Sequence, residues 1–288
     1  MANFDLTMRG KVCLITGATS GIGEATAYAV AKEGATTVIV GRNLEKSTTV
    51  VERIKLQTDN PNVDFLLADL SSQMQIHQLA EQFKRQYSRL DVLVNNVGGA
   101  FFDRQLSADG IEMTFALNYL SGFLLTALLL DTLKASTPSR IINISSATHK
   151  AAHLDESDWQ TQKKYSGIEA YHRSKLANLL FTYELAQRLN GSGVTVNAVK
   201  PGFTKTRLGQ NNKWSPMLLL LRLITTIAAQ SAEKGAETAI YLATSPDVIT
   251  VSGKYFDKQV AISSSKESYN AAAAKHLWQL SEALLKLA

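Results

Sequence analysis

The strongest constraint on the fold is a regular alternation between short runs of β-branched or aliphatic residues and longer stretches with helical periodicity. The runs that predict strands lie at 12–16, 37–40, 63–68, 92–95, 141–145, 194–199 and 254–256. Helical patterns lie at 22–32, 44–57, 74–86, 111–133, 171–189 and 231–243. Such alternation is typical of βαβ units, which place parallel strands in one sheet with helices on both faces. The sequence therefore predicts an α/β fold with a doubly wound parallel sheet of about seven strands.

Length and composition fit a single domain over residues 1–288. Hydrophobic residues make up 45% of the chain and charged residues 19%, which is enough apolar material for a sizeable core. Two segments stand outside the alternation. Residues 203–230 form a long excursion after the sixth strand, which we interpret as a substrate lid, with a membrane-surface patch or an oligomer contact as alternatives. Leucines at helical spacing predict a C-terminal amphipathic helix over about 271–287.

Charge and cysteine content narrow the class of protein. The net charge is +5, but the 30 basic residues are scattered, so we expect no nucleic-acid partner and favour a small phosphorylated ligand. The single cysteine, Cys13, excludes an internal disulfide. The residues from Met1 to Arg9 lack the apolar core of a signal peptide, and we expect no membrane-length span. A soluble, cytoplasmic protein is the expectation.

A glycine-rich turn separates the first strand from the first helix. Gly17, Gly21 and Gly23 allow the backbone to turn tightly and a diphosphate to approach the amide groups at the helix start. Between a strand and a helix, such a turn predicts a dinucleotide site and makes this a Rossmann-type sheet, with a ligand-free turn as the alternative. The other residues of the predicted site in this turn are Thr19, Ser20 and Ile22.

The end of the second strand favours one nicotinamide dinucleotide over the other. An acidic residue at this point holds the ribose 2′-hydroxyl of NAD, whereas a basic one holds the 2′-phosphate of NADP. The sequence here is Gly41-Arg42-Asn43, with no carboxylate. An arginine can make a bidentate hydrogen bond to phosphate oxygens. Arg42 with Asn43 therefore predicts NADP(H) as the cofactor; a surface arginine at a strand end is the alternative.

A candidate acid/base pair lies in the fifth helical pattern. Tyr171 and Lys175 are four residues apart, so their side chains share one helical face. An ammonium about 4 Å from a phenolate stabilises it by about 4 kcal/mol at an effective dielectric near 20, which corresponds to about 3 pK units. We predict that Lys175 makes Tyr171 a usable acid/base. The fifth strand ends with Ser145 and Ser146, of which strand alternation lets only one face the site.

These motifs together resemble the short-chain dehydrogenase/reductase family over nearly the whole chain. The resemblance rests on the Gly-x-x-x-Gly-x-Gly turn, on Asn143-Ile144-Ser145-Ser146, and on Tyr171-His172-Arg173-Ser174-Lys175. It implies that Ser146, rather than Ser145, is the catalytic hydroxyl and that Asn118 holds a water relay to Lys175; a local helix bond is the alternative for Asn118. The segment 171–181 and Leu277-Trp278 look like the retinol dehydrogenase branch.

The resemblance also implies further cofactor contacts. Asp69 would meet the adenine amino group, with helix capping as the alternative, and Val97 stands where this motif usually has alanine. Pro201 to Thr204 resemble the segment that contacts the nicotinamide carboxamide. The implied cofactor residues outside the glycine-rich turn and the acid/base pair are Asp69, Leu70, Asn96, Gly98, Pro201, Gly202, Phe203, Thr204 and Thr206.

The sequence therefore predicts an NADP(H)-dependent oxidoreductase that interconverts a bulky apolar alcohol with its ketone or aldehyde. A regulatory protein that senses NADP(H) without turnover is the alternative. Residues 147–170 include His149, His153, Asp155, Asp158 and Trp159, whose spacing matches no zinc pattern, so we expect no metal and a loop at the pocket rim. The predicted helix at 171–189 also carries the apolar residues Leu179, Phe181 and Tyr183. They either form a contact in a homo-oligomer or pack inward.

Overall fold

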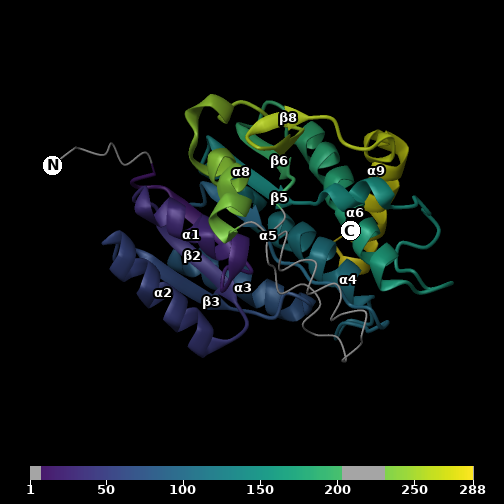
Figure 1. The fold of residues 1–288 in the computed structure, drawn as a ribbon, viewed down its shortest axis with the longest axis horizontal. Coiled ribbons are helices and arrows are strands. Elements are labelled where there is room, and N and C mark those ends of the chain that lie inside the picture. Colours follow the sequence, from purple (N-terminus) through teal and green to yellow (C-terminus); the bar gives the residue numbers. More distant parts are fainter. Residues whose placement is uncertain (1–7, 203–230, 288) are drawn as a thin grey trace.

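A computed structural model describes residues 8–202 and 231–287 (Figure 1). Its strands are β1 (Val12–Thr16), β2 (Thr36–Gly41), β3 (Val63–Leu67), β4 (Val92–Asn95), β5 (Ser139–Ile144), β6 (Val194–Val199), β7 (Lys254–Asp257) and β8 (Val260–Ile262). They form one sheet in the order β3-β2-β1-β4-β5-β6-β7-β8, in which β8 alone runs antiparallel to its neighbour. The predicted doubly wound parallel sheet is confirmed. The strand that the sequence did not reveal is β8, which has three exposed residues and no alternating pattern.

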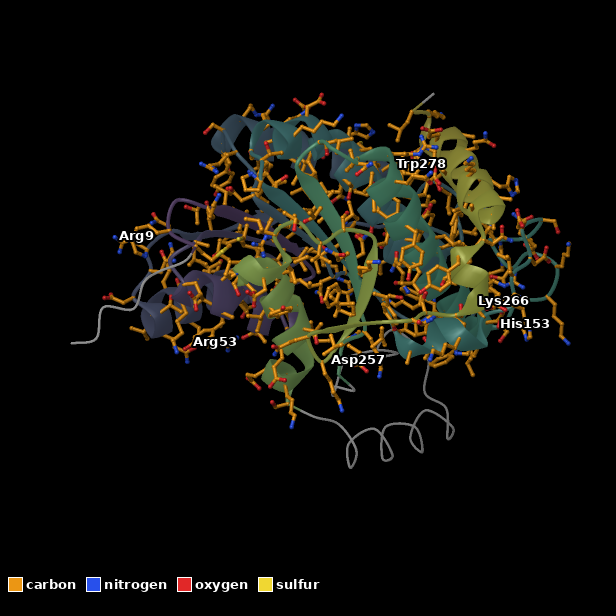
Figure 2. All side chains as sticks on the ribbon, turned by 90° about the horizontal axis from the view of Figure 1, so that it is seen from above. Arg9, Arg53, His153, Asp257, Lys266 and Trp278 are labelled. Atoms are coloured by element: carbon orange, nitrogen blue, oxygen red, sulfur yellow. The ribbon has the colours of Figure 1, made fainter. Side chains whose placement is uncertain are left out.

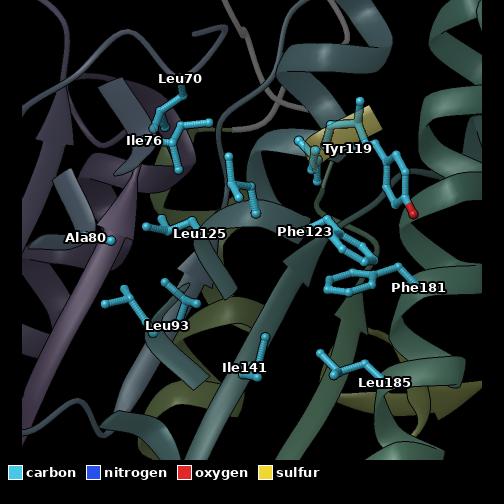
Figure 3. Packing of buried hydrophobic residues seen from close by; sticks show 14 of the residues in the cluster. Leu70, Ile76, Ala80, Leu93, Tyr119, Phe123, Leu125, Ile141, Phe181 and Leu185 are labelled. Carbon is cyan, nitrogen blue, oxygen red and sulfur yellow. The ribbon is translucent and has the colours of Figure 1, made fainter. Parts of the chain in front are cut away.

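The helices form a layer on each face of the sheet (Figure 1). The cluster on one face joins β1, β2, β4 and β5 to α1 (Gly21–Lys32), α2 (Leu44–Thr58) and α8 (Ala232–Thr244). On the opposite face, the cluster contains α3 (Gln73–Gln86), α5 (Ser121–Ala135), α6 (Gly167–Arg188) and α9 (Ala271–Leu285). Successive side chains of a strand point to opposite faces of the sheet, so each strand contributes to both clusters. Leu14, for example, packs on one face and Ile15 on the other. Figure 3 shows Leu93 beneath Leu125 and Ile141 below the rings of Phe123 and Phe181.

Short turns complete the chain. They are α4 (Met113–Phe115), the π-helical turn η1 (Ala116–Leu120), and the 3-10 turns η2 (Ala147–Ala151), η3 (Pro246–Val248) and η4 (Lys266–Tyr269). The helix that carries Tyr171 begins at Gly167, four residues earlier than predicted, because Ser166 caps it by accepting a hydrogen bond from the Glu169 amide. Tyr171 therefore lies in the second turn of α6.

The last helix, α9, packs against the outer side of α5 and α6. Trp278 is labelled on α9 in Figure 2. Its ring packs against Phe123 and Phe181, with centroid distances of 4.7 and 6.0 Å, and the Arg188 guanidinium lies 4.0 Å from its centroid. The Tyr119 hydroxyl is 2.8 Å from that of Ser281. Leu179 and Phe181 are both buried within the chain, so of the two expectations for these residues, inward packing is the one that the structure shows.

One stretch of the described residues is long and apolar enough to cross a membrane, contrary to the sequence expectation. It runs from Met113 to Ala135, through α4, η1 and α5, and 72% of its most apolar window is buried inside the protein. Its side chains, among them Phe115 and Phe123, belong to the main hydrophobic cluster. The hydropathy of this stretch is therefore explained by its place in the core.

Candidate active site

A cleft of about 380 Å³ opens at the carboxyl ends of β1 to β4, where parallel sheets usually bind ligands. The residues of the predicted cofactor site that line it are Gly17, Thr19, Ser20, Arg42, Asn43, Asp69, Leu70 and Gly98. Gly21, Ile22, Gly23 and Asn96 were also predicted but do not line it; Gly21 lines a neighbouring pocket with Glu24 and Arg53. The structure thus gathers residues from four separate strand ends along one edge of the sheet.

The glycine-rich turn is held against the loop after β4. Gly17 has a φ of +63°, and a Cβ atom there would lie 2.9 Å from the Val97 Cα atom. The Asn96 amide donates to the carbonyl oxygens of Thr16 and Gly17 at 2.8 and 3.2 Å. A Cβ on Gly23 would lie 2.5 Å from the same Asn96 nitrogen. Asn96 therefore fixes the shape of the turn from below, and does not point into the cleft.

The amino end of α1 lacks a side-chain cap, unlike those of α2, α3, α6, α8 and α9. Ser20 precedes α1 in extended conformation, but its side chain accepts no hydrogen bond from the helix amides. The corresponding residues of α2, α3, α6, α8 and α9 all accept one. Gly21 has a φ of +62°, and a Cβ there would meet no described atom within 4 Å. The first amides of α1 are therefore available to an anion, which the helix dipole also favours.

Two basic side chains lie in the cleft near the end of β2. Arg42 and Lys46 both line it and, among the residues that the structure describes, neither forms an ion pair. Asn43 serves as the cap of α2, since its Oδ1 atom accepts the Lys46 amide at 2.9 Å. A dianionic group placed here would meet two cations.

Asp69 shapes a turn and lines the cleft, but it is not the cap of α3. Its Oδ1 atom accepts hydrogen bonds from the Ser71 amide and hydroxyl at 2.9 and 2.7 Å, so it shapes the turn before α3. The residue that caps α3 is Ser72. Asp69 also lines the cleft together with Leu70.

The predicted acid/base residues meet at the carboxyl end of β5. The Tyr171 hydroxyl lies near the Ser146 side chain, which acts to lower the pKa of the phenol, and the Lys175 Nζ atom lies 5.5 Å from the centre of the Tyr171 ring. Lys175 is 4% exposed and donates to the Ile144 carbonyl oxygen at 3.1 Å. A Cβ on Gly98, which lines the cleft, would lie 3.6 Å from the Lys175 Nζ atom. The dinucleotide cleft and the acid/base group are therefore contiguous.

Burial is the largest cause of the pKa shifts of both Tyr171 and Lys175. It raises the pKa of Tyr171 to about 12, an effect that the hydrogen bond from Ser146 opposes. It lowers the pKa of Lys175 from 10.5 to about 8. Lys175 is not among the groups that shift the pKa of Tyr171, and its Nζ atom is directed at the Ile144 carbonyl oxygen. The activation of the phenol by the ammonium therefore stays a prediction.

The two serines at the end of β5 have different surroundings. The Ser145 hydroxyl is buried and donates to the Lys175 carbonyl oxygen at 2.8 Å. The Ser146 hydroxyl accepts the Thr148 amide at 3.2 Å and faces Tyr171. Ser146 is thus the serine in contact with the phenol, whereas Ser145 ties β5 to α6.

Asn118 lies in the π-helical turn η1, and such turns often mark functional sites. Its Oδ1 atom accepts the Gly99 amide at 2.7 Å, while its Nδ2 atom donates to the Gly99 carbonyl at 2.9 Å and to the Ser174 hydroxyl at 3.0 Å. These are long-range bonds, so the alternative of a local helix bond does not describe it. The side chain of Asn118 joins the loop after β4 to α6.

Comparison with known proteins agrees with this geometry. A family model described as short chain dehydrogenase matches residues 11–215. The chain belongs to the short-chain dehydrogenase family. It is 42% identical to retinol dehydrogenase 13 of Mus musculus, over 98% of this chain and 86% of that protein. Polyprenol dehydrogenase of Homo sapiens is 40% identical, over 94% of this chain and 84% of that protein.

A solved structure extends the likeness. The Pseudomonas aeruginosa RhlG/NADP active-site complex has a TM-score of 0.69 and 27% identity, covering 88% of this chain and 97% of that one. The resemblance to retinol dehydrogenases expected from the sequence is confirmed, and this short-chain dehydrogenase is an oxidoreductase.

Part of the predicted site of this short-chain dehydrogenase lies outside the described residues. Phe203, Thr204, Thr206 and the proposed lid at 203–230 belong to that part. Pro201 and Gly202 are described and follow β6, where the Gly202 amide approaches the Gly235 carbonyl oxygen at 3.4 Å. They stay candidates for the nicotinamide end.

The structure gives two residues of this dehydrogenase a place that the sequence did not predict. Lys46 sits in the first turn of α2, where the helix dipole disfavours a cation, and that placement is the signal that could have revealed it. His149 is buried rather than at a pocket rim. Within the described ranges, no group of three or more His, Cys, Asp or Glu side chains is arranged to hold a metal.

Proposed function

We propose that this short-chain dehydrogenase uses NADP(H) to interconvert an alcohol with its ketone or aldehyde. The observation that carries the proposal is the continuity of the dinucleotide cleft with the Ser146, Tyr171 and Lys175 group, through Gly98. A cofactor bound along the cleft would bring its reactive end toward Tyr171, whose pKa the Ser146 side chain acts to lower.

The residues present fit a dinucleotide phosphate. The uncapped start of α1 supplies amide donors for the diphosphate, and the open space at Gly21 lets it approach them. Arg42 and Lys46 supply two cations for a 2′-phosphate, and the absence of a carboxylate at the end of β2 disfavours NAD. The NADP complex of the related Pseudomonas aeruginosa RhlG supports the same choice.

The roles of the protein groups follow from their contacts. When bound, the nicotinamide supplies or receives the hydride. The Tyr171 hydroxyl gives a proton to the substrate oxygen, or takes it back, as general acid/base. The Ser146 hydroxyl orients that oxygen. Lys175 keeps a positive charge beside the phenol, and Asn118 fixes the loop against which Lys175 packs.

For the substrate, we propose a bulky apolar molecule. The relatives named retinol dehydrogenase and polyprenol dehydrogenase act, by those names, on long isoprenoid alcohols. Residues 217–221 of the chain, Met-Leu-Leu-Leu-Leu, are apolar and follow the strand that leads to the nicotinamide end. An apolar segment at that place favours a hydrocarbon-rich substrate.

The test is a panel of retinal-like and aromatic aldehydes and ketones, incubated with NADPH and, in parallel, with NADH. We expect NADPH oxidation with the bulkiest apolar members. Saturable binding of NADPH without oxidation across the panel would contradict the enzyme and favour the sensing protein.

Arg42→Asp tests the cofactor choice. Loss of a charge-assisted bond to the 2′-phosphate, with a carboxylate placed there instead, should raise the KM for NADPH by about tenfold or more. The KM for NADH should stay within about twofold, since that cofactor carries no phosphate at this position. Arg85→Asp, an exposed change of equal charge on α3, is the control. Equal effects on both cofactors at Arg42 would exclude the 2′-phosphate contact.

A further inference from the structure

His149 lies three residues after Ser146 and is 1% exposed. Its Nδ1 atom is 2.6 Å from the Ser146 carbonyl oxygen, and its Nε2 atom is 3.0 Å from the Ser265 amide nitrogen. The imidazole therefore links the turn that carries Ser146 to the segment between β8 and η4, which is 116 residues away along the chain.

The two partners define the protonation of the ring. A carbonyl oxygen can only accept, so Nδ1 must carry a hydrogen, and a backbone amide can only donate, so Nε2 must not. Both bonds are made only by the neutral imidazole with its hydrogen on Nδ1. Burial lowers the pKa of His149, and the Lys150 charge acts in the same direction. Glu267 on η4 acts in the opposite direction, and the Tyr255 ring on β7 lies edge-on at 5.1 Å.

The far end of this link is itself anchored. Ser264, next to Ser265, shares hydrogen bonds with the Tyr183 hydroxyl at 2.7 Å and with the Tyr269 hydroxyl at 3.1 Å. Tyr183 belongs to α6, three turns beyond Tyr171. The helix that carries the phenol and the turn that carries the serine are thus braced against the same segment.

Within the part of the chain that the structure describes, few other hydrogen bonds hold Ser146. It precedes the short turn η2, and its hydroxyl accepts the Thr148 amide at 3.2 Å. Its carbonyl oxygen also receives the His149 amide at 3.3 Å, a longer contact than the one from the ring. The bond from the His149 ring is therefore the shortest contact that fixes the backbone of Ser146.

We propose that His149 is a positioning residue that keeps the Ser146 hydroxyl facing Tyr171 through the bond from its ring to the Ser146 carbonyl. The inference rests on the proposed function of Ser146. It assigns to the buried imidazole a task in the reaction although the ring touches neither substrate nor cofactor.

Three variants separate this role from a structural one. In His149→Asn the side-chain nitrogen can take the place of Nδ1 and donate to the Ser146 carbonyl oxygen. In His149→Gln the side-chain oxygen can reach the place of Nε2 and accept from the Ser265 amide, so that only this bond is kept. His149→Phe keeps neither. With NADPH and the best carbonyl of the panel, we expect kcat to fall by about tenfold in the Gln and Phe variants. The Asn variant should stay within about threefold of wild type, and the KM for NADPH should not change in any of them.

The outcomes decide between the two roles. A purely structural role predicts lower thermal stability with kcat preserved in the folded protein, and no difference between Asn and Gln; either result overturns the proposal. Imidazole ¹⁵N shifts of wild-type protein, followed from pH 6 to 8, should show the neutral form with its hydrogen on Nδ1. An imidazolium at pH 7 would overturn the hydrogen-bonding scheme. A wild-type protein that binds NADPH but reduces no carbonyl would overturn the proposed function and the catalytic part of this inference, while the ¹⁵N result would still decide the hydrogen bonds.

Discussion

The turn after β1 and the turn after β5 lie at the same edge of the sheet but treat their polar groups in opposite ways. After β1, Ser20 leaves the first amides of α1 without a side-chain partner, and Gly21 borders open space. After β5, the Ser145 hydroxyl, the Ser146 carbonyl and both ring nitrogens of His149 all have partners in the protein. The first turn is built to be completed by a ligand, whereas the backbone and ring groups named for the second turn are already paired, although the buried Thr148 hydroxyl there has no partner among the described residues.

The difference matches what each turn has to do. A cofactor that must bind and leave in each cycle needs donors that protein groups do not already occupy. A hydroxyl that must orient a substrate oxygen needs a fixed direction, which comes from supporting hydrogen bonds made before the substrate arrives. If the comparison is right, changes near β5 should alter turnover or stability, and changes near β1 should alter cofactor binding.

Tyr171→Phe should give the largest effect. It removes the proton donor while keeping the ring, and general acid/base groups contribute about 10² to 10⁴ in rate, so kcat should fall by about that factor. NADPH affinity, measured by fluorescence titration, should stay within about twofold because the cleft lining is untouched. Turnover that survives in Tyr171→Phe would remove the basis for the proposed mechanism.

Lys175→Met should stabilise the protein although it impairs turnover. The pKa of Lys175 is lowered from 10.5 to about 8 by burial, so between these pH values the unfolded chain holds a proton that the folded protein has released. The free energy of unfolding of wild type therefore rises with pH across this window. Below pH 8 the buried ammonium costs on the order of 3 kcal/mol, and Met removes that cost.

Urea unfolding at pH 7 and pH 10 measures this effect. We expect the gain from Lys175→Met to be large at pH 7 and to shrink toward pH 10.5, while the exposed control Lys275→Met stays near wild type at both. A gain that does not depend on pH would show that packing, and not the buried charge, is responsible.

The sequence predicts well whatever depends on local pattern. Seven of the eight strands follow from their β-branched runs, and strand alternation with the family pattern favours Ser146 over Ser145, in agreement with the contacts of the two hydroxyls. The strand β8 has no such pattern, because all three of its residues are exposed and none is a core position among the described residues.

Features that depend on distant partners escaped prediction. The π-helical turn at Asn118 coincides with contacts to Gly99 and Ser174, and the buried state of His149 requires Ser265. The position of the Lys175 ammonium, directed at Ile144, likewise depends on how α6 packs on β5. Each of these needs a pairing of segments that no single stretch of sequence encodes.

Gly21→Ala gives the smallest effect but compares the cofactor turn with a matched position elsewhere. Gly21 and Gly191 have φ values of +62° and +77°, and in both a Cβ would meet no described atom within 4 Å. An alanine should therefore cost each site about 1 kcal/mol of stability through backbone strain alone. Only Gly21 borders the uncapped amides of α1, so only there should the added methyl weaken NADPH binding, by about tenfold. Equal NADPH affinity in the two variants, measured by fluorescence titration, would mean that the diphosphate does not bind at the start of α1, and the contrast between the two turns would lose its functional meaning.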